Sequence, residues 1–221
     1  MKPYPRRLLV LTPPLVVMAL VILVSNILVQ IPIQHVVEVA GWRLDLAELL
    51  TWGAVTYPVA FLVTDTTNRV HGKQAARQVV YAGFALGVVL SLLAALGIAS
   101  EAASRDGVAV LSALLTDSDA QSMLRIALAS GTAFLVGQLL DVAIFHRLRN
   151  ASWWKAPAVS SLFGSLSDTA LFFSLAFAGT GLSWMGWAVG DFCVKLLMVA
   201  LLLYPFRLLV SVYPKFQRQY I

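Results

Sequence analysis

The chain has 221 residues, of which 59% are hydrophobic and only 12% are charged, with a mean hydropathy of +0.82. A typical soluble domain is about 25% charged, so this composition excludes an ordinary soluble enzyme and indicates an all-α integral membrane protein. The formal net charge of +5 does not indicate nucleic-acid binding, because the basic residues lie at the ends of apolar stretches and form no single patch.

Apolar stretches long enough to cross a bilayer recur along the chain. A hydrocarbon core about 30 Å thick requires roughly 20 apolar residues in a helix. Six stretches meet this requirement, at about residues 8–34, 47–66, 78–98, 124–145, 156–178 and 184–209. They predict six transmembrane helices in a single membrane domain that covers residues 1–221. Residues 99–123 are expected to form the one sizeable loop, on the external side.

Pro32 lies near the end of the first stretch, and Pro58 lies within the second. Because proline lacks an amide hydrogen, we expect each to bend its helix. The first stretch follows Arg6 and Arg7 and so looks like a signal peptide. Its apolar run of about 25 residues is too long for a signal sequence, whose apolar region has roughly 7–15, and we expect a retained helix.

The basic residues are distributed unequally between the two ends of the predicted helices. One side carries Lys2, Arg6, Arg7, Arg69, Lys73, Arg77, Arg147, Arg149, Lys155, Arg207, Lys215 and Arg218. The opposite side carries Arg43, Arg105 and Arg125 with the acids Glu38, Asp45, Glu101, Asp106, Asp117 and Asp119. This is the positive-inside pattern, which predicts that both termini are cytoplasmic.

Polar and aromatic side chains recur at helical spacing inside the apolar stretches. Residues i, i+4, i+7 and i+11 share one face of a helix. The faces found in this way are Asn26 with Gln30; Tyr57, Phe61, Asp65 and Asn68; Phe134, Gln138, Asp141 and Phe145; Ser161, Ser165, Asp168 and Phe172; and Trp184, Trp187, Asp191 and Lys195. Since such faces are costly in contact with lipid, we expect them to converge on an interior cavity.

Several of these polar residues have a structural interpretation as well as a functional one. Asp191 and Lys195, four residues apart, form either a neutralising pair or a pair that opens during function. Ser165 suits close helix packing, and Asp65, beside Arg69, suits an interfacial cap. Asp168 differs, because it lies mid-span with no basic residue within one turn, so its partner must come from another helix or from a ligand.

Longer motifs surround these residues between positions 26 and 204. They are Ser-Asn-Ile-Leu-Val-Gln-Ile-Pro at 25–32, Thr-Trp-Gly-Ala-Val-Thr-Tyr-Pro at 51–58, Phe-Leu-Val-Thr-Asp at 61–65, Gly-Gln-Leu-Leu-Asp at 137–141, Ser-Leu-Phe-Gly-Ser-Leu-Ser-Asp-Thr at 161–169 and Asp-Phe-Cys-Val-Lys at 191–195. Together they resemble the queuosine precursor transporter family, also called the vitamin uptake transporter family. The resemblance implies a multi-pass importer in a bacterial inner membrane. Its substrates would be 7-cyano-7-deazaguanine and the aminomethyl analogue, salvaged for queuosine synthesis in transfer RNA.

The chemistry of such a ligand matches the polar residues of the chain. A guanine-like edge presents a ring N–H and an amine, which one carboxylate can accept together, and we expect Asp168 to be that acceptor. The expected polar shell is Gln138, Asp141, Asn26, Gln30 and Ser165, and the expected stacking residues are Phe134, Phe172 and Trp187. Stacking on an aromatic ring is worth about 1–3 kcal/mol per base. Asp191, Lys195 and Asp65 are expected to serve coupling or gating.

No catalytic or phosphate-binding motif is present in the sequence, so no catalytic residue, metal site or cofactor is expected. The single cysteine, Cys193, excludes an intramolecular disulfide. The expected partners are the small-molecule substrate and the lipid bilayer; self-association stays open. The alternative function is a substrate-capturing subunit of an ATP-driven energy-coupling-factor transporter. Such subunits often carry an Ala-x-x-x-Ala motif in the first helix, where this chain has only Ala19.

Overall fold

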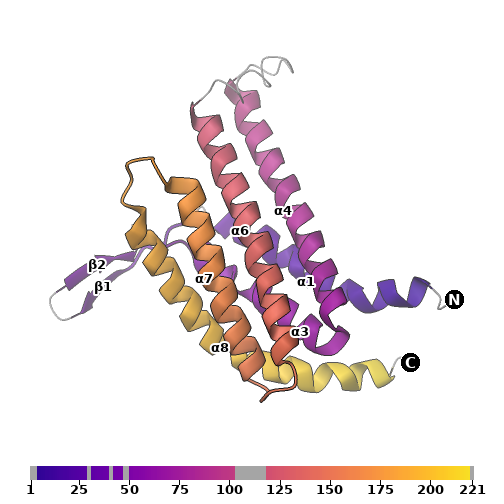
Figure 1. Cartoon of the computed structure of the whole chain (residues 1–221). Helices are drawn as coiled ribbons and strands as arrows, with labels where there is room; N and C mark the ends of the chain where they lie inside the picture. Colours follow the sequence, from indigo (N-terminus) through magenta and orange to yellow (C-terminus); the bar gives the residue numbers. More distant parts are fainter. Residues whose placement is uncertain (1–3, 29–30, 40–41, 47–49, 103–117, 220–221) are drawn as a thin grey trace.

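A computed structural model describes residues 4–28, 31–39, 42–46, 50–102 and 118–219, which form a bundle of helices with one small hairpin (Figure 1). The helices are α1 (Tyr4–Leu28), α2 (Trp52–Thr56), α3 (Val59–His71), α4 (Lys73–Ala102), α6 (Ser118–Leu148), α7 (Lys155–Phe177) and α8 (Trp184–Gln219). The strands β1 (Val36–Val39) and β2 (Trp42–Asp45) form the hairpin.

Four of the described helices contain segments long and apolar enough to cross a membrane: Leu11–Leu28, Leu124–Leu148, Lys155–Phe177 and Trp184–Val212. They match the first, fourth, fifth and sixth predicted stretches and support an integral membrane protein. The second stretch is divided between α2 and α3, because the chain breaks at Tyr57 and Pro58. The expected effect of Pro58 is thus confirmed, and six uninterrupted helices are not formed.

The first helix ends earlier than predicted, at Leu28 instead of residue 34. At Pro32 the described chain is no longer helical, and Pro32 pairs in an antiparallel bridge with Thr51. The amide of Ile33 donates to the Leu50 carbonyl at 3.0 Å. A proline cannot donate to a helix and disfavours helical geometry in the preceding residue. Pro32 therefore lies in an extended segment beyond the helix, and the expected bend is wrong.

The hairpin was not expected; the other elements of the described chain are helices, as predicted. Strand β1 pairs antiparallel with β2, with Val36 opposite Asp45 and Val39 opposite Trp42. Three of the four residues of β1 are valine, and β-branched side chains favour strands. The expected external loop is also partly helical, because α4 continues to Ala102 and α6 begins at Ser118; residues 103–117 lie outside the described part.

Helices α6 and α7 lie side by side in the middle of the bundle (Figure 1) and pack closely at two glycines. A Cβ atom placed on Gly137 would lie 3.0 Å from the Gly164 carbonyl oxygen and 3.0 Å from Cβ of Asp168. A Cβ on Gly164 would lie 2.8 Å from the ring of Phe61 and 3.1 Å from Cβ of Asp141. Only glycine allows this approach, which brings the polar faces of the two helices together.

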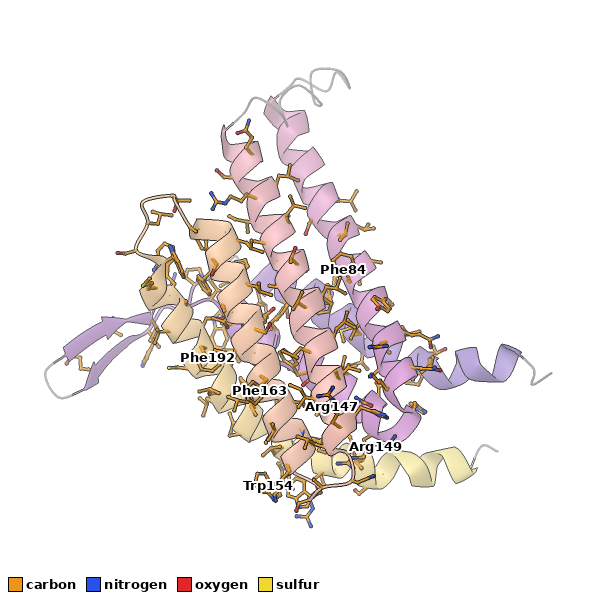
Figure 2. All side chains as sticks on the ribbon, viewed as in Figure 1. Phe84, Arg147, Arg149, Trp154, Phe163 and Phe192 are labelled. Atoms are coloured by element: carbon orange, nitrogen blue, oxygen red, sulfur yellow. The ribbon has the colours of Figure 1, made fainter. Side chains whose placement is uncertain are left out.

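Basic residues gather where α6 passes into α7, at the end marked by Arg147, Arg149 and Trp154 (Figure 2). There Arg69 of α3 donates to the backbone carbonyl of Arg149. At the other end of α7, the guanidinium of Arg125 donates to the carbonyls of Leu175 and Ala178 at 2.8 and 2.6 Å. The gathering of basic residues at one end of the bundle agrees with their unequal distribution in the sequence. That this end faces the cytoplasm stays a prediction.

Candidate functional site

A cavity of about 430 Å³ lies between α1, α2, α4, α6, α7 and α8. One part of its wall is aromatic, with Tyr57, Phe84, Phe134, Phe172, Phe173, Phe177 and Trp187. The polar part consists of Ser25, Asn26, Thr51, Ser91, Ser130, Asp168, Asp191 and Lys195. Concave sites that combine apolar walls with a few polar groups are typical of small-molecule binding.

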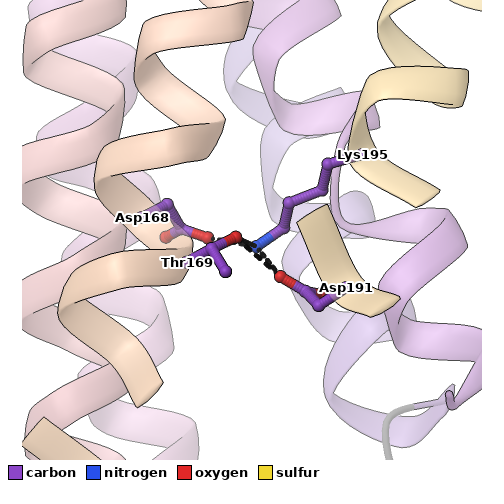
Figure 3. Close-up of polar contacts among 4 residues, drawn as sticks. All are labelled: Asp168, Thr169, Asp191 and Lys195. Atoms are coloured by element: carbon purple, nitrogen blue, oxygen red, sulfur yellow. Dashed lines mark hydrogen bonds and ion pairs between the residues drawn. The ribbon is translucent and has the colours of Figure 1, made fainter. Parts of the chain in front are cut away.

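An ion network joins α7 to α8 at this cavity (Figure 3). Nζ of Lys195 lies 2.6 Å from Oδ2 of Asp168 and 2.6 Å from Oδ2 of Asp191. The ammonium also donates to Oγ1 of Thr169 at 3.0 Å, and that hydroxyl donates to Oδ2 of Asp191 at 2.7 Å. Asp168 thus has the partner from another helix that its mid-span position required, and Lys195 has the pairing with Asp191 that their spacing suggested.

The network has one more carboxylate than ammonium groups. With all three groups charged, Asp168, Asp191 and Lys195 carry a net charge of −1. Lys195 has three donor hydrogens, and its three contacts use all of them. Within the described residues, no hydrogen bond engages Oδ1 of Asp168. The site therefore retains acceptor capacity for a ligand that carries N–H donors.

The aromatic wall consists of two groups of rings at the cavity. The Phe177 ring lies edge-on to Trp187, at 5.6 Å between centroids, and to Phe172, at 6.0 Å. On another side of the cavity, Tyr57 and Phe134 pack edge-on at 5.9 Å. Edge-on packing leaves ring faces available, and a flat heterocycle could stack on them.

The structure divides the predicted site residues into two sets. The cavity is lined by Asn26, Phe134, Asp168, Phe172, Trp187, Asp191 and Lys195. The side-chain amide of Asn26 donates to the carbonyl of Ile22 in its own helix at 2.8 Å. Four others, Asp65, Gln138, Asp141 and Ser165, are buried among the helices and do not line this cavity. Gln30 lies outside the described residues. The helical spacing suggested that all the polar faces converge on one cavity. The structure instead distributes their residues between this cavity and the buried interior of the bundle.

Two of the buried carboxylates, Asp65 and Asp141, lie together in a second polar cluster. Oδ1 of Asp65 accepts from Ser160 at 3.3 Å, and Oδ2 accepts from Ser161 at 3.2 Å. The hydroxyl of Ser161 also lies 3.4 Å from Oδ1 of Asp141. A further buried hydrogen bond, at 2.9 Å, runs from the hydroxyl of Thr64 to the amide oxygen of Gln138.

The sequence did not identify Thr169 in the ion network, or Phe173 and Phe177 in the aromatic wall. The three residues are spaced by four, so a second face of the same helix, counted from Thr169, would have found them. Ser160 was missed in the same way, because only its neighbour Ser161 was assigned to the polar face. The polar and aromatic residues of α7 at these sites therefore occupy more than one line of positions along the helix.

The family profile described as "Putative vitamin uptake transporter" matches residues 51–210. The "Queuosine precursor transporter" of Escherichia coli is 38% identical over 189 residues, which cover 81% of this chain and 76% of that protein. The "Probable queuosine precursor transporter" of Haemophilus influenzae is 36% identical over 170 residues, covering 71% of this chain and 65% of that protein.

The "Probable queuosine precursor transporter" of Bacillus subtilis is 30% identical over 134 residues, covering 58% of this chain and 57% of that protein. The chain therefore spans less than two thirds of the Haemophilus and Bacillus relatives. No solved structure matches the chain. The resemblance found in the sequence motifs is confirmed: the chain belongs to the putative vitamin uptake transporter family, a family of membrane transporters and not of enzymes.

Proposed function

We propose that this protein imports the queuosine precursors 7-cyano-7-deazaguanine and its aminomethyl analogue across a bacterial inner membrane. The names of three relatives support this class of substrate. In the proposed topology the chain crosses the membrane six times, with α2 and α3 together forming the second crossing, and both termini are cytoplasmic. The basic residues at one end of the bundle support this orientation.

The single observation that carries the proposal is the cavity in which an ion network and an aromatic wall lie together. A deazaguanine would direct its ring N–H and its amine to the carboxylate of Asp168. Its carbonyl would accept a hydrogen bond from Lys195, and its flat ring would stack near Trp187 or Phe134. The two kinds of contact recognise the edge and the face of the same molecule.

Substrate binding would also weaken the link between α7 and α8. Because the three donors of Lys195 are already engaged, a substrate carbonyl can accept one only by replacing Asp168, Asp191 or Thr169. The freed carboxylate can then accept from the substrate. Where Asp168 is the partner replaced, occupancy of the cavity would exchange the interhelical ion pair for bonds to the ligand, which biases the helices toward a different arrangement.

The test is uptake of labelled 7-cyano-7-deazaguanine into liposomes that contain the purified protein and no other. We expect saturable uptake that the unlabelled aminomethyl analogue inhibits and that unlabelled adenine does not inhibit. If the protein binds the precursor but takes it up only beside an ATP-driven module, it is the capturing subunit of such a transporter. If it neither binds nor takes up either precursor, the proposed function is wrong.

A further inference from the structure

A pair of buried carboxylates outside the cavity has no role in the function proposed so far. Asp65 of α3 and Asp141 of α6 have exposed fractions of only 2% and 0%. Oγ of Ser161 on α7 lies 3.2 Å from Oδ2 of Asp65 and 3.4 Å from Oδ1 of Asp141, so one hydroxyl group joins the two carboxyl groups. Three helices therefore meet at this pair.

Within the part of the chain that the structure describes, neither carboxylate forms an ion pair with a basic side chain, although the charge of Arg69 acts on Asp65 from a greater distance. Arg69, one turn beyond Asp65, donates to the carbonyl of Arg149, and its guanidinium lies 5.2 Å from the Phe145 ring centroid. The surrounding helices also carry, among others, His71 on α3; Arg125, His146 and Arg147 on α6; Lys155 and Asp168 on α7; and Asp191, Lys195 and Arg207 on α8. The α8 residues nearest Asp65 are apolar: Val199, Leu202, Leu203 and Phe206.

The hydrogen-bond pattern of the cluster is short of one proton. Ser160 and Ser161 supply two hydroxyl hydrogens for three contacts with carboxylate oxygens. Oδ2 of Asp141 is fully buried and has no donor among the described residues. Two ionised carboxylates that share one hydroxyl group in a buried site repel each other, and a proton on either of them removes one of the two charges. One added proton would satisfy both the open contact and the buried oxygen.

We propose that Asp65 and Asp141 bind one proton between them, and that this proton drives the import of substrate through the neighbouring cavity. The proposal rests on the proposed function for the transport step and stands apart from it for the binding of the proton. On protonation one carboxylate becomes a carboxylic acid, the other stays ionised, and the O–H donates to it. When the proton leaves, both carboxylates are ionised and repel, which favours separation of α3 from α6.

The carboxylate pair and the ion network of the cavity both contact α7. Ser161 and Asp168 are seven residues apart on this helix, about 10 Å at the rise of an α-helix. Ser165 lies between them in the sequence, and its Oγ is buried without a hydrogen-bond partner in the described residues, as is Nε2 of Gln138 on α6. Cβ of Asp141 and Cβ of Asp168, one from each polar cluster, both lie at the close contact between α6 and α7. A shift of one helix relative to the other would therefore move residues of both clusters.

The first experiment needs no substrate. Infrared difference spectra of the purified protein, recorded between alkaline and acidic pH, report the carbonyl stretch of a protonated carboxyl group. We expect such a band in the unmodified protein, its loss in Asp65→Asn and in Asp141→Asn, and its persistence in the matched acid-to-amide control Glu38→Gln on the hairpin. A spectrum without the band at every pH, or a band that survives in both variants, overturns the proton site.

The second experiment measures transport in proteoliposomes with an imposed gradient. We expect an inward proton gradient to raise accumulation of 7-cyano-7-deazaguanine at least tenfold, and a sodium gradient at constant pH to have no effect. Asp65→Asn and Asp141→Asn are expected to bind the precursor and exchange it across the bilayer but to lose the proton-driven accumulation, while Glu38→Gln keeps it.

The outcomes separate the two proposals. Accumulation that follows the sodium gradient, or that persists in both variants, contradicts proton coupling while import itself stands. Failure of the unmodified protein to bind either precursor contradicts the import function, and the infrared experiment then decides the proton site by itself. Where a variant fails to fold, the spectra of the unmodified protein still test the proton site.

Discussion

Lys195 on α8 contacts Asp168 on α7 at 2.6 Å, although the two residues are 27 positions apart in the chain. The same ammonium contacts Asp191 one turn earlier on its own helix, also at 2.6 Å. Lys195 is therefore the centre of the network, and its two acidic partners depend on it for compensation of their charge. The first two predictions follow from this difference: Lys195 has two acidic partners, whereas the two aspartates share one lysine.

Replacing Asp168 by asparagine should weaken precursor binding while the fold persists. The side-chain volume is kept, but an acceptor oxygen becomes an N–H₂ group that faces the donor edge of the ligand. Such a buried mismatch costs about 1–3 kcal/mol, which corresponds to roughly 5- to 150-fold weaker binding. Lys195 keeps Asp191 and Thr169 as partners. Calorimetric titration of the purified variant measures the change, with Glu38→Gln as control. Unchanged affinity would refute the assignment of Asp168.

Replacing Lys195 by methionine should destabilise the protein more than Asp191→Asn does. The lysine variant leaves two carboxylates without compensation, and loss of one partner from a buried ion pair costs about 3–5 kcal/mol. Asp191 is more exposed, with a side-chain exposed fraction of 16%, and its removal leaves Lys195 paired with Asp168. Thermal unfolding in detergent gives the order, and a triple variant that also carries Asp168→Asn and Asp191→Asn should recover stability lost in Lys195→Met.

The same residues test whether the network acts in transport. The double variant Lys195→Met with Asp191→Asn is compared with the parent for precursor binding and for uptake. We expect a stable double variant to bind precursor more weakly, because the substrate carbonyl loses its donor, and to lose transport even when the precursor saturates the site. If instead it transports as well as the parent, the pair of Asp191 and Lys195 has only a structural role.

Replacing Gly164 by alanine should loosen the packing of α6 on α7. The new Cβ would meet the Phe61 ring at 2.8 Å and the backbone oxygen of Gly137 at 3.1 Å, so the helices must shift. Overpacking of this kind costs about 1–3 kcal/mol, seen as a lower melting temperature. The matched control is Gly186→Ala in α8, where nothing lies within 4 Å and alanine favours a helix by up to about 1 kcal/mol. An equal effect of the two substitutions would contradict the close approach.

Trp187 should report ligand binding through its fluorescence. Its ring lines the cavity beside Phe177, so a stacked deazaguanine would quench its emission. We expect Trp187→Phe to lose most of the quenching and to bind several-fold more weakly, since stacking contributes about 1–3 kcal/mol per base. The control, Trp154→Phe, changes a ring at the basic end with an exposed fraction of 44%. Quenching that disappears with Trp154 and persists without Trp187 would place the ligand elsewhere.

Helical spacing in the sequence was sufficient to assign most of the buried faces. Phe134, Gln138, Asp141 and Phe145 were predicted to share a face, and all four side chains are buried. The apolar stretches located four described helices that are long and apolar enough to cross a membrane, and the motifs identified the family. These features are readable because burial in a helix depends on residues within two or three turns, and because the length of an apolar run reflects the thickness of a bilayer.

The division of the polar residues into a cavity and a buried carboxylate pair required the tertiary structure. Spacing places Ser161 and Asp168 on one face of α7, but it does not show that Asp65 and Asp141 lie against the first and Lys195 against the second. That separation depends on which helices are neighbours, and on the close approach that Gly137 and Gly164 allow between α6 and α7. The backbone of Pro32 is a similar case, because its bridge to Thr51 joins two segments that no local pattern connects. Contacts between distant residues depend on the packing of whole helices, and for that reason a single sequence predicted the faces but not their partners.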